Sequence, residues 1–151
     1  MRFWYQWYFH TERGRNALRD MRGPLSKLLW KLWSPTWAFD DATFARSAAS
    51  LDNRDYVDVV VHSYEHRNGQ AAGDPRHAAV EARLSRLPRI GVPTIVIHGA
   101  DDGVQPPHRS DGQERFYSAS YQRLVPAGVG HNPPQEDPGG FADAVLRLAK
   151  A

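Results

Sequence analysis

The sequence predicts an α/β fold in which helices come first and a strand–helix–strand–helix segment follows. Two short segments lead to this prediction, because each has the length of a strand, contains adjacent apolar residues and stops at a glycine-containing loop. The first, residues 94–98, leads into a loop with Asp101 and Asp102. The second, residues 121–125, leads into a loop with His131. In a parallel sheet both loops would lie at the carboxyl edge, where ligands bind.

Length and composition indicate one domain with a core of its own. The chain has 151 residues, of which 41% are apolar. Its 19 basic and 17 acidic residues are interspersed, with a net charge of +2, which argues against nucleic-acid or membrane partners. Cysteine is absent, so disulfides and thiolate chemistry are excluded. This composition is compatible with the reducing cytoplasm, where we expect the protein to reside.

The aromatic start of the chain, Met1 to Phe9, resembles neither a membrane span nor a signal peptide. It is too short to cross a bilayer and has no aliphatic signal core. Since chain termini are usually polar, we interpret this segment as interior sequence whose upstream partner has been cut off.

Residues 1–88 are predicted to form helices separated by turns. Four helices can be bounded by their caps and breakers. In order, one follows Pro24 and ends at Ser34-Pro35, one follows Asp40, one ends at Asn68-Gly69, and one follows Asp74-Pro75. Their apolar residues recur at helical spacing, as in Leu25, Leu28, Leu29 and Leu32. We interpret this aromatic-rich segment as a cap or lid.

Residues 89–151 are predicted to form the strand–helix–strand–helix segment. The predicted strand 94–98 contains three consecutive apolar residues, Ile95, Val96 and Ile97, which is typical of a strand buried on both faces. A weak helix is expected over 109–117, followed by the strand 121–125. Asp137-Pro138 then starts a final helix. Its inward residues are expected to be Phe141, Val145 and Leu148.

Asp102 and His131 are the strongest candidates for catalysis. A general-base histidine needs a carboxylate at its other ring nitrogen, which fixes the tautomer and stabilises the imidazolium. The order of strand, acid loop, strand and histidine loop is the order in which α/β-hydrolases arrange these two groups. The alternative is that Asp102 caps a turn and His131 is a surface residue.

Both loops resemble segments of α/β-hydrolases related to epoxide hydrolases, haloalkane dehalogenases and esterases. The residues that carry the resemblance are Val92 to Gly99 with Asp102, Gly103, Val104 and Pro106, then Gly128 to His131 with Glu136 and Pro138. The resemblance covers nearly the whole chain, with 1–88 as the helical cap and 89–151 as the C-terminal part of the core. It implies a triad in which Asp102 orients His131, and Asp101 is the less favoured acid.

The nucleophile half of such a hydrolase is absent from the sequence. No G-x-S-x-G elbow occurs, and the G-x-D-x-G match at 99–103 is followed by prolines rather than by a helix. The resemblance therefore implies a truncated or split hydrolase that acts with its missing N-terminal half on a small epoxide, halide or ester. An aspartate nucleophile would give an alkyl-enzyme and a serine an acyl-enzyme, and the sequence leaves this choice open.

Tyr64 and Trp7 are candidate substrate-binding residues. Tyr64 lies on the apolar face of its predicted helix, and the resemblance implies that it donates a hydrogen bond to the leaving oxygen or halide. The residue after the family's tyrosine is often arginine, whereas here it is Glu65. Trp7 matches the start of the cap, where aromatic residues line the leaving-group pocket. Either side chain could instead be a structural core aromatic.

Two other functions compete with the hydrolase. His62 and His66 form an H-x-x-E-H pattern that could hold zinc on one helical face, but no third ligand is evident and the pair is predicted to face solvent. We therefore expect no metal and no cofactor. The second alternative is a non-catalytic fragment or a binding domain.

Overall fold

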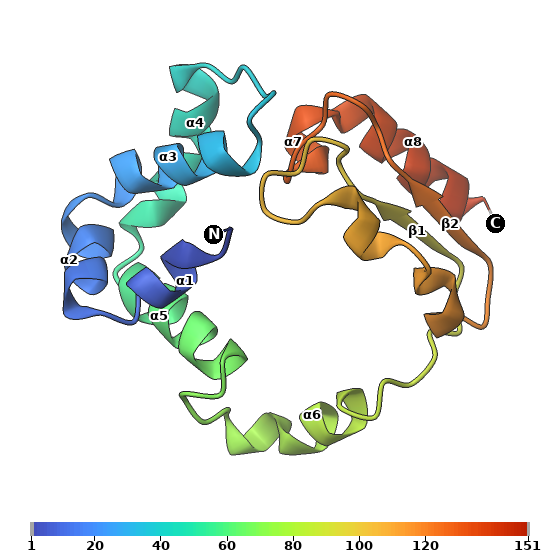
Figure 1. Ribbon diagram of the computed structural model, residues 1–151, viewed down its shortest axis with the longest axis horizontal. Coiled ribbons are helices and arrows are strands. Elements are labelled where there is room, and N and C mark those ends of the chain that lie inside the picture. Colours follow the sequence, from blue (N-terminus) through green and yellow to red (C-terminus); the bar gives the residue numbers. More distant parts are fainter. Residues whose placement is uncertain (1, 151) are drawn as a thin grey trace. The chain divides into compact units, whose positions relative to one another are not determined.

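The computed structural model describes residues 2–150, which form two compact units (Figure 1). The first unit contains the chain up to Trp30 together with Ala38–Ala78, and the second contains Lys31–Trp37 together with Ala79 onward. Met1, where the predicted aromatic segment starts, lies outside the described residues. The predicted division at residue 88 into a cap and a core segment stays a prediction.

The described part of the first unit is helical. Its elements are α1 (Trp4–Tyr8), α2 (Glu12–Asp20), most of α3 (Arg22–Trp33), α4 (Asp41–Ala48), a 3-10 turn (Ala49–Asp52) and α5 (Tyr56–Arg67). The core of the unit consists of apolar side chains from α1, α2, α3 and α5 with Phe9, which follows α1. These buried residues are Tyr5, Phe9, Leu18, Leu29 and Val61.

The predicted ends of α4 and α5 are confirmed. Asp40 caps α4, because its carboxylate accepts a hydrogen bond from the Thr43 N–H at 2.7 Å. Helix α5 ends at Arg67, and Asn68 is its C-cap. Gly69 then has a φ of +74°, a left-handed conformation that glycine adopts without a steric penalty.

Helix α3 ends where the sequence predicts and begins slightly earlier. It runs to Trp33, immediately before Ser34-Pro35. Its first residue is Arg22 rather than Pro24, and the proline occupies the first turn, where a missing N–H costs nothing.

The helix predicted after Asp74-Pro75 is a 3-10 turn (Pro75–His77) followed by α6 (Ala78–Leu84). Its apolar residues Val80 and Leu84 are exposed in the structure. The spacing of these apolar residues therefore predicts the helix correctly, although the helix does not bury them.

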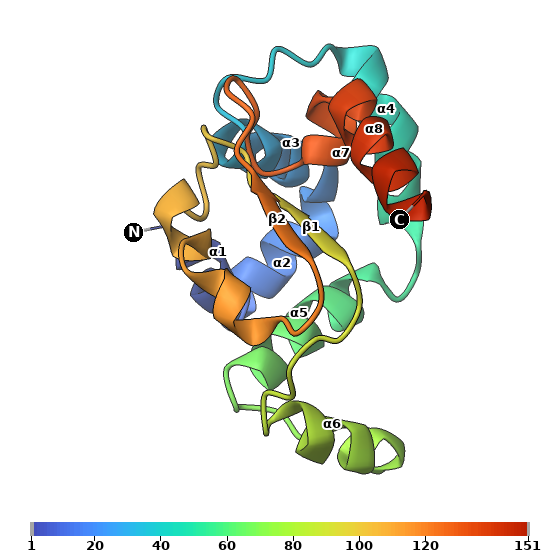
Figure 2. The same cartoon turned by 90° about the vertical axis from the view of Figure 1, so that its right-hand side faces the viewer.

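Two parallel strands, β1 (Thr94–Ile97) and β2 (Tyr121–Leu124), form the sheet of the second unit. Thr94 is in register with Tyr121 and Ile97 with Leu124, and Figure 2 shows the two arrows running in the same direction. The prediction that the first strand is buried on both faces is wrong. All four residues of β1 are half-buried, and within residues 2–150 this strand pairs along one edge only.

The connection between the strands contains two 3-10 turns, Pro107–Ser110 and Gln113–Phe116. The helix predicted over 109–117 is therefore wrong. Gly112, between the turns, has a φ of +69°, which interrupts a right-handed helix.

Two helices follow β2, the short α7 (Pro133–Glu136) and α8 (Pro138–Ala149). Asp137 caps α8 as predicted, accepting a hydrogen bond from the Gly140 N–H at 3.0 Å.

Helix α8 contacts β1, but the residues predicted to point inward are not its buried ones. Ala144 is its buried residue, whereas Phe141, Val145 and Leu148, which were expected to point inward, are exposed. Together with Ile95 and other residues, these three side chains line an apolar pocket of about 270 Å³ beside the strand. Over residues 2–150, no helix combines the length and the apolar character that crossing a membrane requires.

Candidate active site

Asp102 lies in the loop after β1 and is held in one orientation. Its Oδ1 atom accepts hydrogen bonds from the N–H groups of Val104 at 2.7 Å and Gln105 at 2.8 Å. The carboxylate is buried, and these two bonds compensate for the water that it loses. Because Oδ1 is occupied, Oδ2 is left to face the histidine loop.

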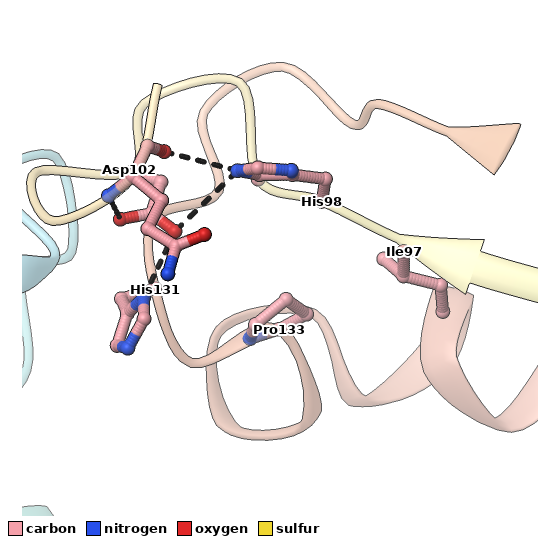
Figure 3. Close-up of a pocket in the computed structure, with 8 residues that line it drawn as sticks. Ile97, His98, Asp102, His131 and Pro133 are labelled. Carbon is pink, nitrogen blue, oxygen red and sulfur yellow. Dashed lines mark hydrogen bonds and ion pairs between the residues drawn. The ribbon is translucent and has the colours of Figure 1, made fainter. Parts of the chain in front are cut away.

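His131 meets this second oxygen. Its Nδ1 atom lies 2.8 Å from Asp102 Oδ2, as the dashed line in Figure 3 shows. A carboxylate can only accept, so Nδ1 carries the hydrogen and Nε2, on the opposite side of the ring, is available as a base. The side chain of Asp102 is 6% exposed and that of His131 is 35% exposed. A buried acid thus orients a partly accessible imidazole, the geometry that general-base catalysis requires.

Close backbone contact between the two loops makes this pairing possible. The Ala100 N–H donates to the Pro126 carbonyl at 3.0 Å, and the Asp101 N–H donates to the Val129 carbonyl at 2.9 Å. A Cβ atom on Gly99 would lie 2.0 Å from the carbonyl oxygen of Gly130. Glycine is therefore required at position 99 for the loops to approach this closely.

His98 is a second imidazole beside Asp102, and the sequence analysis did not assign it to the site. Its Nε2 atom lies 2.9 Å from the Gln105 carbonyl oxygen and 3.6 Å from Asp102 Oδ2. Its Nδ1 atom lies 2.8 Å from Ser110 Oγ. Because the carbonyl only accepts, Nε2 carries a hydrogen, and the ring ties the loop around Asp102 together.

The backbone of the histidine loop is held by Glu136. Its carboxylate accepts hydrogen bonds from the N–H groups of Gly130 at 2.6 Å and Asn132 at 2.8 Å. It also accepts from the hydroxyl of Ser34 at 2.6 Å. In the sequence Ser34 is recognisable only as the end of a helix, so its contact with this loop is not predicted.

A pocket of about 220 Å³ opens beside the two imidazoles. Figure 3 shows Asp102 between His98 and His131, with Pro133 beside the pocket and Ile97 at the end of the strand. The pocket gives a small molecule access to the carboxylate–histidine pair.

The comparisons with known proteins found one similar solved structure. A crystal structure of a "putative epoxide hydrolase" from Klebsiella pneumoniae subsp. pneumoniae matches 99% of the chain, with 41% sequence identity and a TM-score of 0.92. The fold is epoxide hydrolase-like. The chain spans 49% of the length of that structure. No protein-family model and no curated protein sequence matches the chain.

Tyr64 and Trp7 lie in the first unit. The Tyr64 ring packs edge-on against Tyr5, with ring centroids 5.8 Å apart, and Tyr5 was not predicted as part of a site. Burial and, secondly, the neighbouring Tyr5 raise the pKa of Tyr64 to about 12. Trp7 is exposed and stacks edge-on with His10. Glu65, which follows Tyr64, forms an ion pair with Arg15.

The zinc hypothesis gains no support from the structure. The rings of His62 and His66 are stacked with centroids 6.1 Å apart. His66 Nδ1 lies 3.2 Å from the carbonyl oxygen of Ala71, which holds a hydrogen on that nitrogen. Residues 2–150 contain no group of three His, Cys, Asp or Glu side chains that could hold a metal ion.

We expect Tyr64 to ionise near pH 12. Its folded pKa of about 12 lies above the ordinary value of 10.0, so its contribution to stability is complete below pH 10 and is lost as the pH rises through 12. Absorbance at the tyrosinate band should show one group ionising near pH 12 that disappears in Tyr64→Phe. Ionisation of Tyr64 near pH 10 would contradict its burial.

Proposed function

We propose that this chain supplies the acid–base half of a hydrolase that opens small epoxides. Asp102 orients His131, and His131 Nε2 removes a proton from water. The observation that carries the proposal is the 2.8 Å contact between His131 Nδ1 and Asp102 Oδ2, at the carboxyl end of two parallel strands. The likeness to a structure described as an epoxide hydrolase favours epoxides over halides and esters as the substrate class.

The proposed reaction has two steps. A carboxylate nucleophile attacks an epoxide carbon, the carbon–oxygen bond of the ring breaks, and the leaving oxygen takes a proton from the phenol of Tyr64. A water molecule then loses a proton to His131 Nε2 and attacks the carbonyl carbon of the ester, which releases a diol and regenerates the carboxylate. The proton held by His131 returns through solvent to the Tyr64 phenolate, which restores both side chains. The pKa of Tyr64, raised to about 12, keeps this phenol protonated and able to donate. Trp7 is proposed to line the pocket for the leaving group.

The nucleophile is proposed to come from a partner segment that adds strands to β1. In support, β1 pairs along one edge only within residues 2–150, and apolar side chains of α8 remain exposed beside that strand. An unpaired strand edge is a template for another strand. The proposed roles of residues 1–88 as a cap and 89–151 as part of the core fit this arrangement.

Reconstitution tests the proposal. The 151-residue chain would be mixed with the part of the Klebsiella protein that the match leaves uncovered, and hydrolysis of styrene oxide would be followed by diol formation. We expect turnover from the mixture and none from either polypeptide alone. A chlorinated alkane and p-nitrophenyl acetate, assayed in parallel, separate the three substrate classes. Turnover by the isolated chain that persists in His131→Ala would contradict the proposal.

The alternative is a binding domain without catalysis, and the missing nucleophile elbow favours it. This function predicts ordered circular dichroism and no hydrolysis with any partner. Binding of the diol or of the intact epoxide to the isolated chain, measured by calorimetry and lost when the pocket is blocked by Gln105→Trp, would support it.

A further inference from the structure

The segment Lys31–Trp37 belongs to the same compact unit as the acid and histidine loops, although it lies far from them in sequence. It contacts both loops. The carbonyl oxygen of Trp33 accepts a hydrogen bond from the N–H of Gly103 in the acid loop at 2.9 Å. The Trp33 ring meets the His131 ring edge-on, with centroids 5.7 Å apart.

Ser34 is the residue through which this segment holds the histidine loop. The side chain is 1% exposed. Its hydroxyl donates to Glu136 Oε1 at 2.6 Å, and its oxygen accepts from the His131 N–H at 3.1 Å and from Asn132 Nδ2 at 3.2 Å. A serine hydroxyl has one hydrogen and two lone pairs, so its hydrogen-bonding capacity is fully used.

The backbone of Ser34 also fits closely against the histidine loop. A Cβ atom on Gly130 would lie 2.6 Å from Ser34 Cα and 2.8 Å from Ser34 Cβ. On the acid side, a Cβ atom on Gly103 would lie 2.0 Å from the carbonyl oxygen of Leu32. Glycine in each loop therefore admits the segment between them.

We propose that Ser34 is a positioning residue for His131. The His131 ring is partly exposed, so packing alone does not fix it. The segment Lys31–Trp37 holds the backbone of His131 through the hydrogen bond from the His131 N–H to the Ser34 hydroxyl. Glu136 accepts the hydrogen of that hydroxyl and thereby orients it, so Ser34 links the half-buried Glu136 carboxylate to the catalytic histidine. The consequence for turnover rests on the proposed function, because displacement of a catalytic base by about 1 Å can cost roughly 100-fold in rate.

The test compares Ser34→Ala with Thr36→Ala in the full 151-residue chain. Thr36 is a matched control, because it lies on the same segment and its hydroxyl donates at 3.3 Å to Gly128 of the same loop without contacting His131 or Glu136. Nitrogen-15 NMR would report the ring tautomer of His131, and amide exchange would report its backbone N–H. In Ser34→Ala we expect exchange to accelerate roughly tenfold, the factor for one hydrogen bond. The Nδ1–H signal of the ring should weaken, and Thr36→Ala should match the wild type.

Two outcomes would overturn the proposal. One is a folded Ser34→Ala protein with a lower melting temperature but an unchanged His131 tautomer and exchange rate, as a purely structural role predicts. The second outcome applies if Ser34→Ala does not fold, in which case Ser34→Thr, which keeps the hydroxyl, takes its place. A folded Ser34→Thr protein that lacks the wild-type Nδ1–H signal of His131 would then overturn the proposal. Restoration of that signal in Ser34→Thr supports the proposal. None of these readouts needs hydrolysis, so failure of the proposed function would be seen separately, in the reconstitution assay.

Discussion

Asp102→Asn is expected to lower the kcat of the reconstituted hydrolase about 10⁴-fold while the protein stays folded. The reason lies in how the carboxylate is held. Oδ1 accepts two backbone N–H bonds, so the carbonyl oxygen of an asparagine must occupy that position. The amide nitrogen would then face His131 and donate to Nδ1. His131 would carry its hydrogen on Nε2 and could no longer accept a proton from water there.

Asp101→Asn is the matched control for this prediction. Asp101 is the adjacent acid, and its backbone N–H bonds to Val129. We expect its replacement to leave kcat within about threefold of the wild type, because its carboxylate lies outside the catalytic pair. A large loss of kcat in Asp101→Asn, together with normal turnover in Asp102→Asn, would contradict the prediction. Asp101 would then be the residue that orients His131.

Gly99→Ala is expected to destabilise the protein by about 3 kcal/mol, at the upper end of the usual cost of overpacking. The new methyl group would lie 2.0 Å from the Gly130 carbonyl oxygen and 2.4 Å from the Val129 carbonyl oxygen. Both are backbone atoms, so the loops must separate to admit the methyl group. Urea unfolding measures the loss, and the separation should also weaken the bond between His131 and Asp102.

Gly23→Ala provides the control, because nothing lies within 4 Å of a Cβ atom at that position in α3. Alanine favours helix over glycine, so we expect a gain of about 0.5–1 kcal/mol. Equal stability of Gly99→Ala and wild type would mean that the acid and histidine loops are further apart than the structure has them.

The sequence predicts the pairing of Asp102 with His131 because local signals locate both. Each residue follows an apolar run and a glycine, and parallel strands bring their carboxyl ends together. The roles of Ser34 and His98 have no such signal. Ser34 meets His131 across 97 positions of the chain, and only the folded backbone shows that contact. His98 ends an apolar run and looks like part of a strand until its ring partners are known.

The exposed apolar residues show a second limit of sequence reasoning. Helical spacing identifies α8 and the residues on its apolar face, but it does not state what covers that face. Ala144 is buried against the unit, whereas Phe141 and Val145 are exposed. The apolar run in β1 likewise predicts a strand correctly while overestimating its burial, since a neighbour on its second edge is absent from residues 2–150. Burial depends on partners that a sequence pattern does not identify.

In the proposed function His131 activates water in a hydrolytic triad, and this claim can be tested by trapping an intermediate. The chain with His131→Gln would be mixed with the nucleophile-bearing part of the Klebsiella protein and with styrene oxide, and the intact mass of each polypeptide would be measured. We expect the partner to gain the mass of one epoxide and to retain it, because the ester forms but water is not activated. Wild-type turnover by the His131→Gln mixture, with no mass gain on either polypeptide, would contradict the claim.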